Sequence, residues 1–156
     1  MISLREMNDM EFEAFKAFLV EDYAADIART YNVSSTEAHS NSEQQINTLL
    51  SQGRTTPRQF LWMVVNETAA SIGHLWCDVD QAQARAFICD IVIYEPYRGK
   101  GYGKQTLLHL EAKLREWSIR RIGLHVFAYN TSAIALYQRL GYQTTGFDMQ
   151  KDLPID

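Results

Sequence analysis

Residues 98–103, with the sequence RGKGYG, are the segment whose residue types and spacing most directly suggest chemistry. They follow an apolar run over residues 87–94 and precede a segment of helical periodicity over residues 104–117. Glycine adopts backbone conformations that other residues avoid, so this segment favours a tight turn lined by backbone amides. At the start of a helix, free N–H groups and the positive end of the helix dipole attract an anion. The segment therefore predicts a site for a phosphate group, most naturally a pyrophosphate.

Two other kinds of phosphate-binding loop match this segment poorly. A nucleotide P-loop has the pattern G-x-x-x-x-G-K-[ST], whereas here Gly99 is followed five positions later by Lys104 and then by Gln105, without the hydroxyl that holds magnesium. The dinucleotide fingerprint G-x-G-x-x-G belongs near the start of a βαβ unit, and this segment lacks its third glycine. A glycine-rich turn without a ligand is the alternative that these six residues leave open.

Two longer stretches together resemble a known family. Residues 90–103, DIVIYEPYRGKGYG, resemble motif A of the GCN5-related N-acetyltransferases (GNAT), a strand followed by a V-x-P-x-x-R-G-x-G-x-G/A loop and a helix. Residues 130–142, NTSAIALYQRLGY, resemble motif B of that family, N-x-x-A-x-x-L-Y-x-x-x-G-F/Y. Two motifs in the right order and ~30 residues apart are much harder to obtain by chance than one glycine loop. The pattern covers residues 69–153, and the preceding half matches by its order of elements.

The resemblance implies a single α/β domain over residues 1–156, with a mixed, mostly antiparallel central sheet that is flanked by helices and has splayed central strands. The chain length of 156 residues and the 46% of hydrophobic residues agree with one domain that folds alone. Periodicity predicts helices over residues 10–31 and 34–50, strands over 59–66, 70–77 and 86–94, a helix over 104–117, a strand over 121–127, a helix after residue 130 and a closing strand over 144–153, with residues 2–6 as a further candidate strand. Asn8 or Asp9, and Ser34 or Ser35, have the residue types that cap helices.

The activity that the resemblance implies is transfer of an acetyl group from acetyl-coenzyme A (acetyl-CoA) directly to an amine. In this family the cofactor arm lies between the splayed strands, which assigns it to the main chain of Ile91, Val92 and Ile93. The pyrophosphate is assigned to Arg98, Gly99, Lys100, Gly101, Tyr102, Gly103 and Lys104. Asn130 has the form of a helix cap and occupies a position at which family members contact the cofactor arm.

Tyr137 is the side chain that motif B assigns to catalysis, as the general acid that protonates the departing sulfur. The general base is less determined, because Cys89 stands where the polyamine-acetylating branch of the family has a glutamate. Asp90, Glu95, His125 or a water molecule are the candidates, and Asp90 ranks first because it lies where the strand meets the cleft.

The amine acceptor is left open between small amines, amino-sugars, peptide N-termini and lysine side chains. Aromatic faces attract cations, and the aromatic candidates for an acceptor pocket are Tyr23, Tyr31, Trp62, Trp76, Phe127 and Tyr129. An acid-rich first helix is a further attraction for an amine, although a solvated helix face is the simpler interpretation. The alternatives to an enzyme are a coenzyme A-binding sensor without turnover and a structural partner-binding domain.

Composition argues against several other classes of function. The net charge of −4 disfavours nucleic acid, and the four scattered histidines disfavour a metal site. Cys77 and Cys89 lack the spacing of a zinc or redox motif, so we expect buried thiols. We expect neither a membrane span nor a signal peptide, and hence a cytoplasmic protein. A homodimer is the common oligomeric state of such chains, although the sequence identifies no interface.

Overall fold

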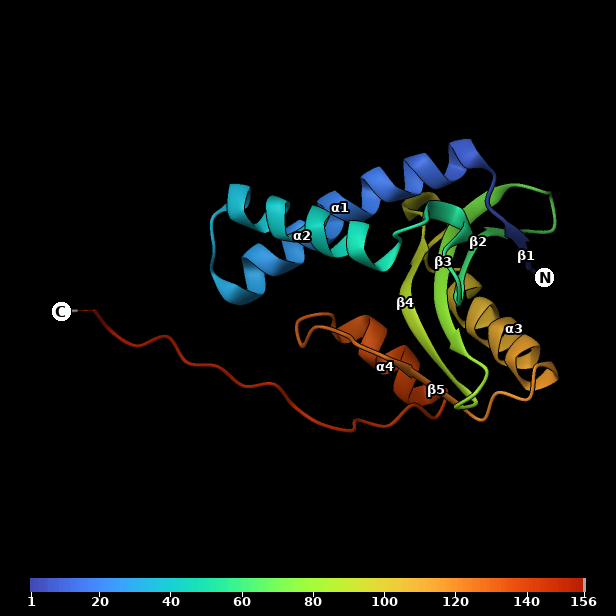
Figure 1. Cartoon of the computed structure of the whole chain (residues 1–156). Coiled ribbons are helices and arrows are strands. Elements are labelled where there is room, and N and C mark those ends of the chain that lie inside the picture. The colour runs from blue at the N-terminus through green and yellow to red at the C-terminus, as the bar shows by residue number, and fades with distance from the viewer. Residues whose placement is uncertain (156) are drawn as a thin grey trace.

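The computed structural model describes residues 1–155 and places a β-sheet between two layers of helices (Figure 1). In chain order the elements are β1 (Ser3–Glu6), α1 (Asp9–Tyr31), α2 (Ser35–Leu49), η1 (Gly53–Thr55), β2 (Gln59–Val65), β3 (Ser71–Asp80), β4 (Arg85–Ile93), η2 (Glu95–Tyr97), α3 (Tyr102–Glu116), β5 (Arg121–Leu124) and α4 (Thr131–Arg139). Here η denotes a short 3-10 helix. The expected order of helices and strands is confirmed up to α4.

Helices α1 and α2 begin at residues whose side chains cap helix N-termini. The Asn8 side chain accepts a hydrogen bond from the Glu11 N–H, and the Glu11 carboxylate accepts one from the Asn8 N–H, which completes a capping box. Asn32 ends α1 in the left-handed conformation, a common way for a helix to stop. Ser34 caps α2 by accepting from the Glu37 N–H. Of the two alternatives at each start, Asn8 and Ser34 are therefore the caps.

The sheet has the order β1-β2-β3-β4-β5 within residues 1–155. The first three pairings are antiparallel and join consecutive strands, whereas β4 and β5 are parallel. A parallel pair needs a long crossover connection, and α3 supplies it. The predicted mixed, mostly antiparallel sheet is confirmed.

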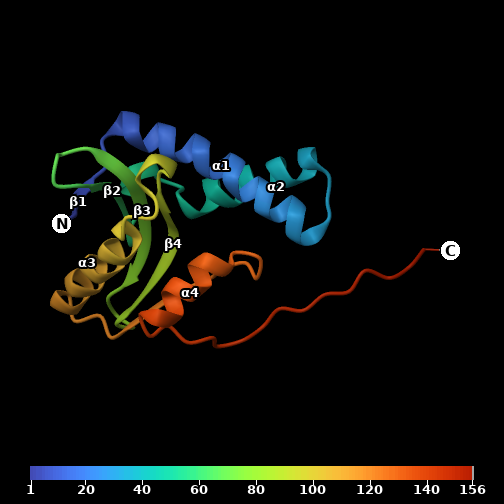
Figure 2. The same ribbon diagram turned by 180° about the vertical axis from the view of Figure 1, so that it is seen from behind.

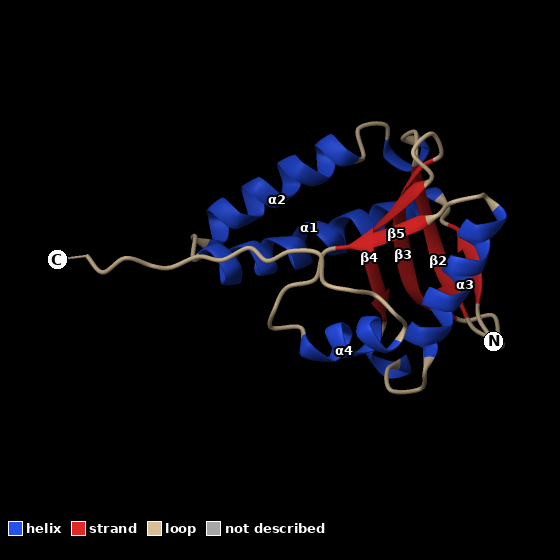
Figure 3. Ribbon diagram, turned by 90° about the horizontal axis from the view of Figure 1, so that it is seen from below, coloured by secondary structure: helices blue, strands red, loops and turns tan. Residues whose placement is uncertain are grey.

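Each face of the sheet packs against its own pair of helices. Helices α1 and α2 cover one face, and α3 and α4 the other, as the views from behind and below show (Figure 2, Figure 3). The core on the α3 side includes Ile72, Leu75, Ile88, Leu107, Leu110 and Leu114. The core on the α1 side includes Phe12, Phe15, Leu19, Leu61, Met63 and Trp76. Residues that alternate along β2 and β3 therefore enter different cores, as the pleat of a strand requires.

The C-terminal end of the chain differs from expectation. The described residues 144–153 contain no strand, so the predicted closing strand is wrong for this chain on its own. After Tyr142 the backbone instead runs away from the sheet in an extended path (Figure 1). A strand exists only when a neighbouring strand completes its ladder of hydrogen bonds, and sequence preference does not supply that neighbour.

Two smaller differences from expectation concern the ends of strands. Strand β5 ends at Leu124 instead of continuing to Phe127, and β3 extends to Asp80 beyond the predicted Cys77. Among the helices in residues 1–155, none combines the length and the apolar character needed to cross a membrane.

Candidate active site

A bulge in β4 decides which way Asp90 points. Across the β3–β4 pair, Trp76 lies opposite Asp90 but Cys77 lies opposite Ile88, so Cys89 is the extra residue. An extra residue shifts the alternation of all that follow it, and bulges commonly redirect side chains beside active sites. Ile91 therefore packs into the core on the α3 side, as Ile88 does, although the two are three positions apart. Asp90 faces α1.

The side chain that meets Asp90 there is His74 from β3, which the sequence analysis did not select. His74 Nε2 lies 2.8 Å from Asp90 Oδ2, and an ionised carboxylate only accepts, so the imidazole N–H donates. His74 is 2% exposed and is held between Phe15, with ring centroids 4.7 Å apart, and Tyr94, at 5.9 Å. This packing fixes the imidazole, and the imidazole in turn fixes the Asp90 carboxylate.

Strands β4 and β5 separate just beyond this point. Their pairing stops at Ile88 and Leu124, whereas β4 continues to Ile93. The predicted splay of the central strands is confirmed. Within the described chain, the β4 edge that carries Ile91 and Val92 therefore has no strand opposite it on the β5 side. The binding of the cofactor arm by this backbone stays a prediction.

The glycine loop follows β4 and leads directly into α3. Gly99 (φ 75°) and Gly101 (φ 83°) both lie in the left-handed region that favours glycine. Gly101 is the N-cap residue of α3, and as a glycine it offers no side chain to cap the first N–H groups. The first bond into the helix runs from Gln105 N–H to Gly101 C=O, at 3.1 Å. Within the described residues the amides between Arg98 and Gln105 are therefore available to an anion.

Gly99 and Gly101 have open space around them, whereas Gly103 lies beside α4. A Cβ built at Gly99 or Gly101 would meet no atom of the described chain within 4 Å, so a ligand can approach the backbone. A Cβ at Gly103 would lie 3.4 Å from Leu136 Cδ2 of α4. This is an ordinary van der Waals distance, so the site beside α4 has room for a small side chain. The loop fits a pyrophosphate, with exposed Lys100 and Lys104 as additional positive charges.

Two other residues of the predicted loop make contacts that the sequence did not indicate. Arg98 Nε donates to the Ile93 carbonyl at 2.7 Å, so this guanidinium group holds the end of β4. The Tyr102 hydroxyl donates to Glu67 Oε1 at 3.2 Å, which ties the start of α3 to the β2–β3 turn. Both side chains thus position the loop, and their contact with a pyrophosphate stays a prediction.

Tyr137 lies on α4 and within the electrostatic reach of Asp90. Burial raises the pKa of its hydroxyl, and the negative charge of Asp90 raises it further. The phenol is therefore fully protonated at neutral pH, as a general acid must be. Its ring packs against Tyr142, with centroids 5.7 Å apart. That Tyr137 and Asp90, predicted from different motifs, act in one site stays a prediction.

The remaining polar candidates fit less well. Glu95 is exposed in η2, and His125 is exposed with its ring against Phe127, at 4.9 Å between centroids. Asn130 is the N-cap residue of α4, but its side chain makes no cap bond among the described residues, so the expected helix-capping role is wrong. A ψ of 65° departs from the extended conformation typical of a capping residue.

The aromatic candidates for an acceptor pocket divide into core and surface residues. Trp62 (4% exposed) and Trp76 (2% exposed) belong to the two cores. Phe127 and Tyr129 stack with ring centroids 5.6 Å apart after β5. The Tyr129 hydroxyl donates to Asp26 of α1, so this aromatic pair lies against the acidic side of that helix.

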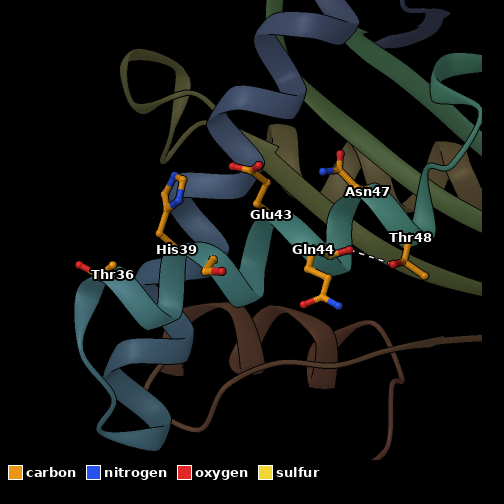
Figure 4. Close-up of a pocket in the computed structure, with 7 residues that line it drawn as sticks. Thr36, His39, Glu43, Gln44, Asn47 and Thr48 are labelled. Atoms are coloured by element: carbon orange, nitrogen blue, oxygen red, sulfur yellow. Dashed lines mark hydrogen bonds between the residues drawn. The ribbon is translucent and has the colours of Figure 1, made fainter.

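A polar hollow of about 610 Å³ on α2 is separate from this site. All its lining side chains come from one helix: Thr36, His39, Ser40, Glu43, Gln44, Asn47 and Thr48 (Figure 4). The site residues predicted from sequence lie on β4, the glycine loop and α4, so they take no part in lining it. The hollow is the solvated face of a helix and does not hold the acetyl-transfer chemistry.

Comparison with known proteins agrees with this geometry. Residues 19–142 match the model of the acetyltransferase (GNAT) family, and this span includes the bulge, the glycine loop and Tyr137. The chain belongs to the GNAT family. It is an N-acetyltransferase, and acetyl-CoA is its cosubstrate.

Full-length relatives of this GNAT enzyme occur in Bacillus subtilis. The N-acetyltransferase YdgE is 35% identical over 97% of this chain and 98% of its own length. YycN is 36% identical over 97% and 99%, and its crystal structure superposes with a TM-score of 0.95 over 99% of this chain and all of that one. A spermine/spermidine N(1)-acetyltransferase from the same organism is 41% identical over a shorter stretch, 44% of this chain and 46% of its own.

Proposed function

We propose that this GNAT enzyme acetylates a primary amino group of a small polyamine, with Asp90 as general base and Tyr137 as general acid. The observation that carries the proposal is the cluster of negative charge that faces Asp90 from α1. Desolvation raises the pKa of the Asp22 carboxyl and the charges of Asp26 and Asp90 raise it further, while the smaller effects of His74 and Arg98 lower it. Carboxylates that repel one another in this way favour a cationic ligand, which relieves the repulsion.

An aromatic pair, Phe127 and Tyr129, lies beside these carboxylates. Tyr129 contacts Asp26 through its hydroxyl, and the Arg29 guanidinium lies 4.5 Å from the Tyr129 ring centroid. Arg29 thus occupies this ring face and Phe127 stacks on the ring at a centroid distance of 5.6 Å, so Tyr129 contributes through its hydroxyl bond to Asp26 and not through an open ring face. The partial identity to the spermine/spermidine N(1)-acetyltransferase supports a polyamine as one class of acceptor. A polyamine offers a second positive charge to Asp22 while its reacting amine lies at Asp90.

Three residues of this chain are assigned to the proton transfers of the reaction. A protonated amine has a pKa near 10.4 and must lose a proton before it can attack, and Asp90 accepts that proton directly or through water. His74 holds the Asp90 carboxylate through the 2.8 Å hydrogen bond. The Tyr137 hydroxyl holds a proton for the departing sulfur.

The backbone at the end of β4 and in the glycine loop would bind the cosubstrate. The amides of residues 99–104 and the charges of Lys100 and Lys104 would hold the pyrophosphate, while the main chain of Ile91, Val92 and Ile93 would orient the arm. Acetyl-CoA, when bound, supplies the activated acetyl group. Burial raises the pKa of the Cys89 thiol to about 12, so at neutral pH it is not a nucleophile, which favours direct transfer to the amine.

A thiol-release assay against a panel of amines tests the proposal. Spermidine and spermine should give a higher kcat/KM than butylamine, glucosamine or a lysine peptide. Asp22→Asn should raise KM for the polyamines roughly tenfold, the effect of losing ~1.4 kcal/mol of charge attraction, and change KM for butylamine much less. Asp90→Asn should lower kcat for every substrate.

Glu13→Gln is the matched control, because it removes an exposed carboxylate from the same helix. It should leave KM for the polyamines nearly unchanged. Equal kcat/KM for spermidine and the lysine peptide, or equal effects of Asp22→Asn and Glu13→Gln, would rule out the proposed acceptor.

A further inference from the structure

One stripe of side chains along α1 leads away from the reaction centre. The stripe starts at Phe18, whose ring lies against His74 with centroids 5.3 Å apart, and His74 in turn holds Asp90. Residues three or four positions apart lie on the same face of a helix. The side chains that continue the stripe at this spacing are Asp22, Asp26 and Arg29. The helix therefore presents two negative charges and then one positive charge, in order of position away from His74.

The two acids of the stripe can act on one ligand. Asp22 lies within electrostatic reach of both Asp90 and Asp26. Like charges one helical turn apart repel each other, and a cation placed between them relieves the repulsion. Asp26 accepts the Tyr129 hydroxyl bond through Oδ1, so that bond does not use Oδ2. The pair of acids therefore suits two ammonium groups of an acceptor whose reacting amine lies at Asp90.

Arg29 ends the stripe, and its surroundings hold it there. The guanidinium group lies 4.5 Å from the Tyr129 ring centroid, Phe127 stacks on the same ring, and the Tyr129 hydroxyl ties the ring to Asp26. Within residues 1–155, Arg29 forms no ion pair with a carboxylate, and its side chain is exposed. Its positive charge is therefore fixed in place and acts on whatever lies along the stripe.

We propose that Arg29 is a specificity-determining residue, which limits how many positive charges an acceptor can carry along α1. The inference rests on the proposed polyamine acceptor. A triamine places its two remaining ammonium groups at Asp22 and Asp26. The fourth amine of a longer chain arrives near Arg29, which lies two turns and about 10 Å beyond Asp22 along the helix. Like charges repel there, so the site favours triamines over tetra-amines.

Turnover of spermidine, which has three amines, and of spermine, which has four, tests this inference. The wild type should have the higher kcat/KM for spermidine. Arg29→Gln should raise kcat/KM for spermine about two- to fivefold, the range that one exposed charge pair contributes, and raise it less for spermidine. The change should lie in KM, and it should shrink at high salt because salt screens exposed charges. Arg29→Lys keeps the charge and should keep the wild-type preference.

Arg115→Gln is the matched control, because it removes an exposed positive charge from the last turn of α3, as Arg29→Gln does from the last turn of α1. It should leave the ratio of the two kcat/KM values unchanged.

Three outcomes would overturn the inference. If Arg29→Gln kept the wild-type ratio while both polyamines remained better substrates than butylamine, the role of Arg29 would be wrong and the proposed function would stand. If Arg29→Lys changed the ratio as Arg29→Gln does, the positive charge would not be the cause. If neither polyamine was a better substrate than butylamine, the proposed acceptor and the role of Arg29 would both be wrong.

Discussion

At the scale of single residues, Cys89 affects the site through its backbone position and not through its thiol. Cys89, which stands where the resemblance implies a glutamate, is the bulged residue of β4. Its thiol is protonated at neutral pH, because burial raises its pKa to about 12. The bulge turns the next residue, Asp90, toward His74 and α1. The bulge therefore places a carboxylate at the position where we propose the general base.

Tyr137→Phe tests the proposed general acid. Loss of the hydroxyl should lower kcat by about 10²–10⁴-fold, the usual contribution of a positioned acid, with little change in the affinity for acetyl-CoA. Because burial raises the pKa of Tyr137 above its ordinary value of 10.0, the hydroxyl keeps its proton at pH 7 to 9, and kcat should not decline over that range.

Tyr31→Phe is the control for this substitution, since Tyr31 is 58% exposed at the end of α1. It should leave kcat unchanged. If Tyr137→Phe weakened acetyl-CoA binding by the same factor as turnover, Tyr137 would have a binding role instead.

At the scale of elements, β3 and β4 lie unusually close at Gly73. A Cβ built there would lie 2.1 Å from the Val92 carbonyl oxygen and 3.1 Å from Ile93 Cα. Both atoms belong to the backbone, so they cannot yield as a flexible side chain would. This glycine therefore fixes the end of β4 against β3, immediately before the glycine loop and beside the Ile93 carbonyl that Arg98 binds.

Gly73→Ala should consequently destabilise the protein by about 1–3 kcal/mol, the cost of inserting a methyl group into a packed site. It should also lower kcat, because β4 must move away from β3 at the end that carries Val92. Urea unfolding and the thiol-release assay measure the two effects.

Gly146→Ala is the matched control, because a Cβ there would meet no atom of residues 1–155 within 4 Å. Equal stability of the two variants would show that β4 accommodates the methyl group without strain.

At the scale of the whole molecule, stability depends on the two cores that hold the sheet between its helices. Leu107 and Leu108 are neighbours on α3, yet Leu107 is fully buried and Leu108 is 46% exposed. Leu107→Ala should therefore lower the free energy of unfolding by about 2–5 kcal/mol, the usual cost for a buried leucine. This cost includes the lost transfer energy of the side chain and the cavity that it leaves.

Leu108→Ala makes the same chemical change where little apolar surface is buried. It should change the free energy of unfolding by no more than about 0.5 kcal/mol in either direction, as is usual for surface positions. Comparable losses from both substitutions in urea unfolding would contradict the assignment of Leu107 to the core of the α3 side.

The sequence by itself determined the features that depend on near neighbours. It limited each helix cap to two neighbouring residues, Asn8 or Asp9 and Ser34 or Ser35, which bond to groups about three residues away, and the left-handed turns at Gly99 and Gly101 suit the residue type. The two motifs that identify the family are likewise contiguous runs. Local preferences act over one or two turns of chain, so they can be read without knowing the fold.

The tertiary structure alone decided what depends on pairing between distant segments. His74 and Asp90 are 16 residues apart, and they meet only because the β3–β4 register and the bulge at Cys89 bring them to one face. Residues 144–153 have strand preferences, but they form no strand in the described chain because no strand of their own molecule pairs with them. Register and strand partners are set by long-range packing, and no local pattern in the sequence specifies them.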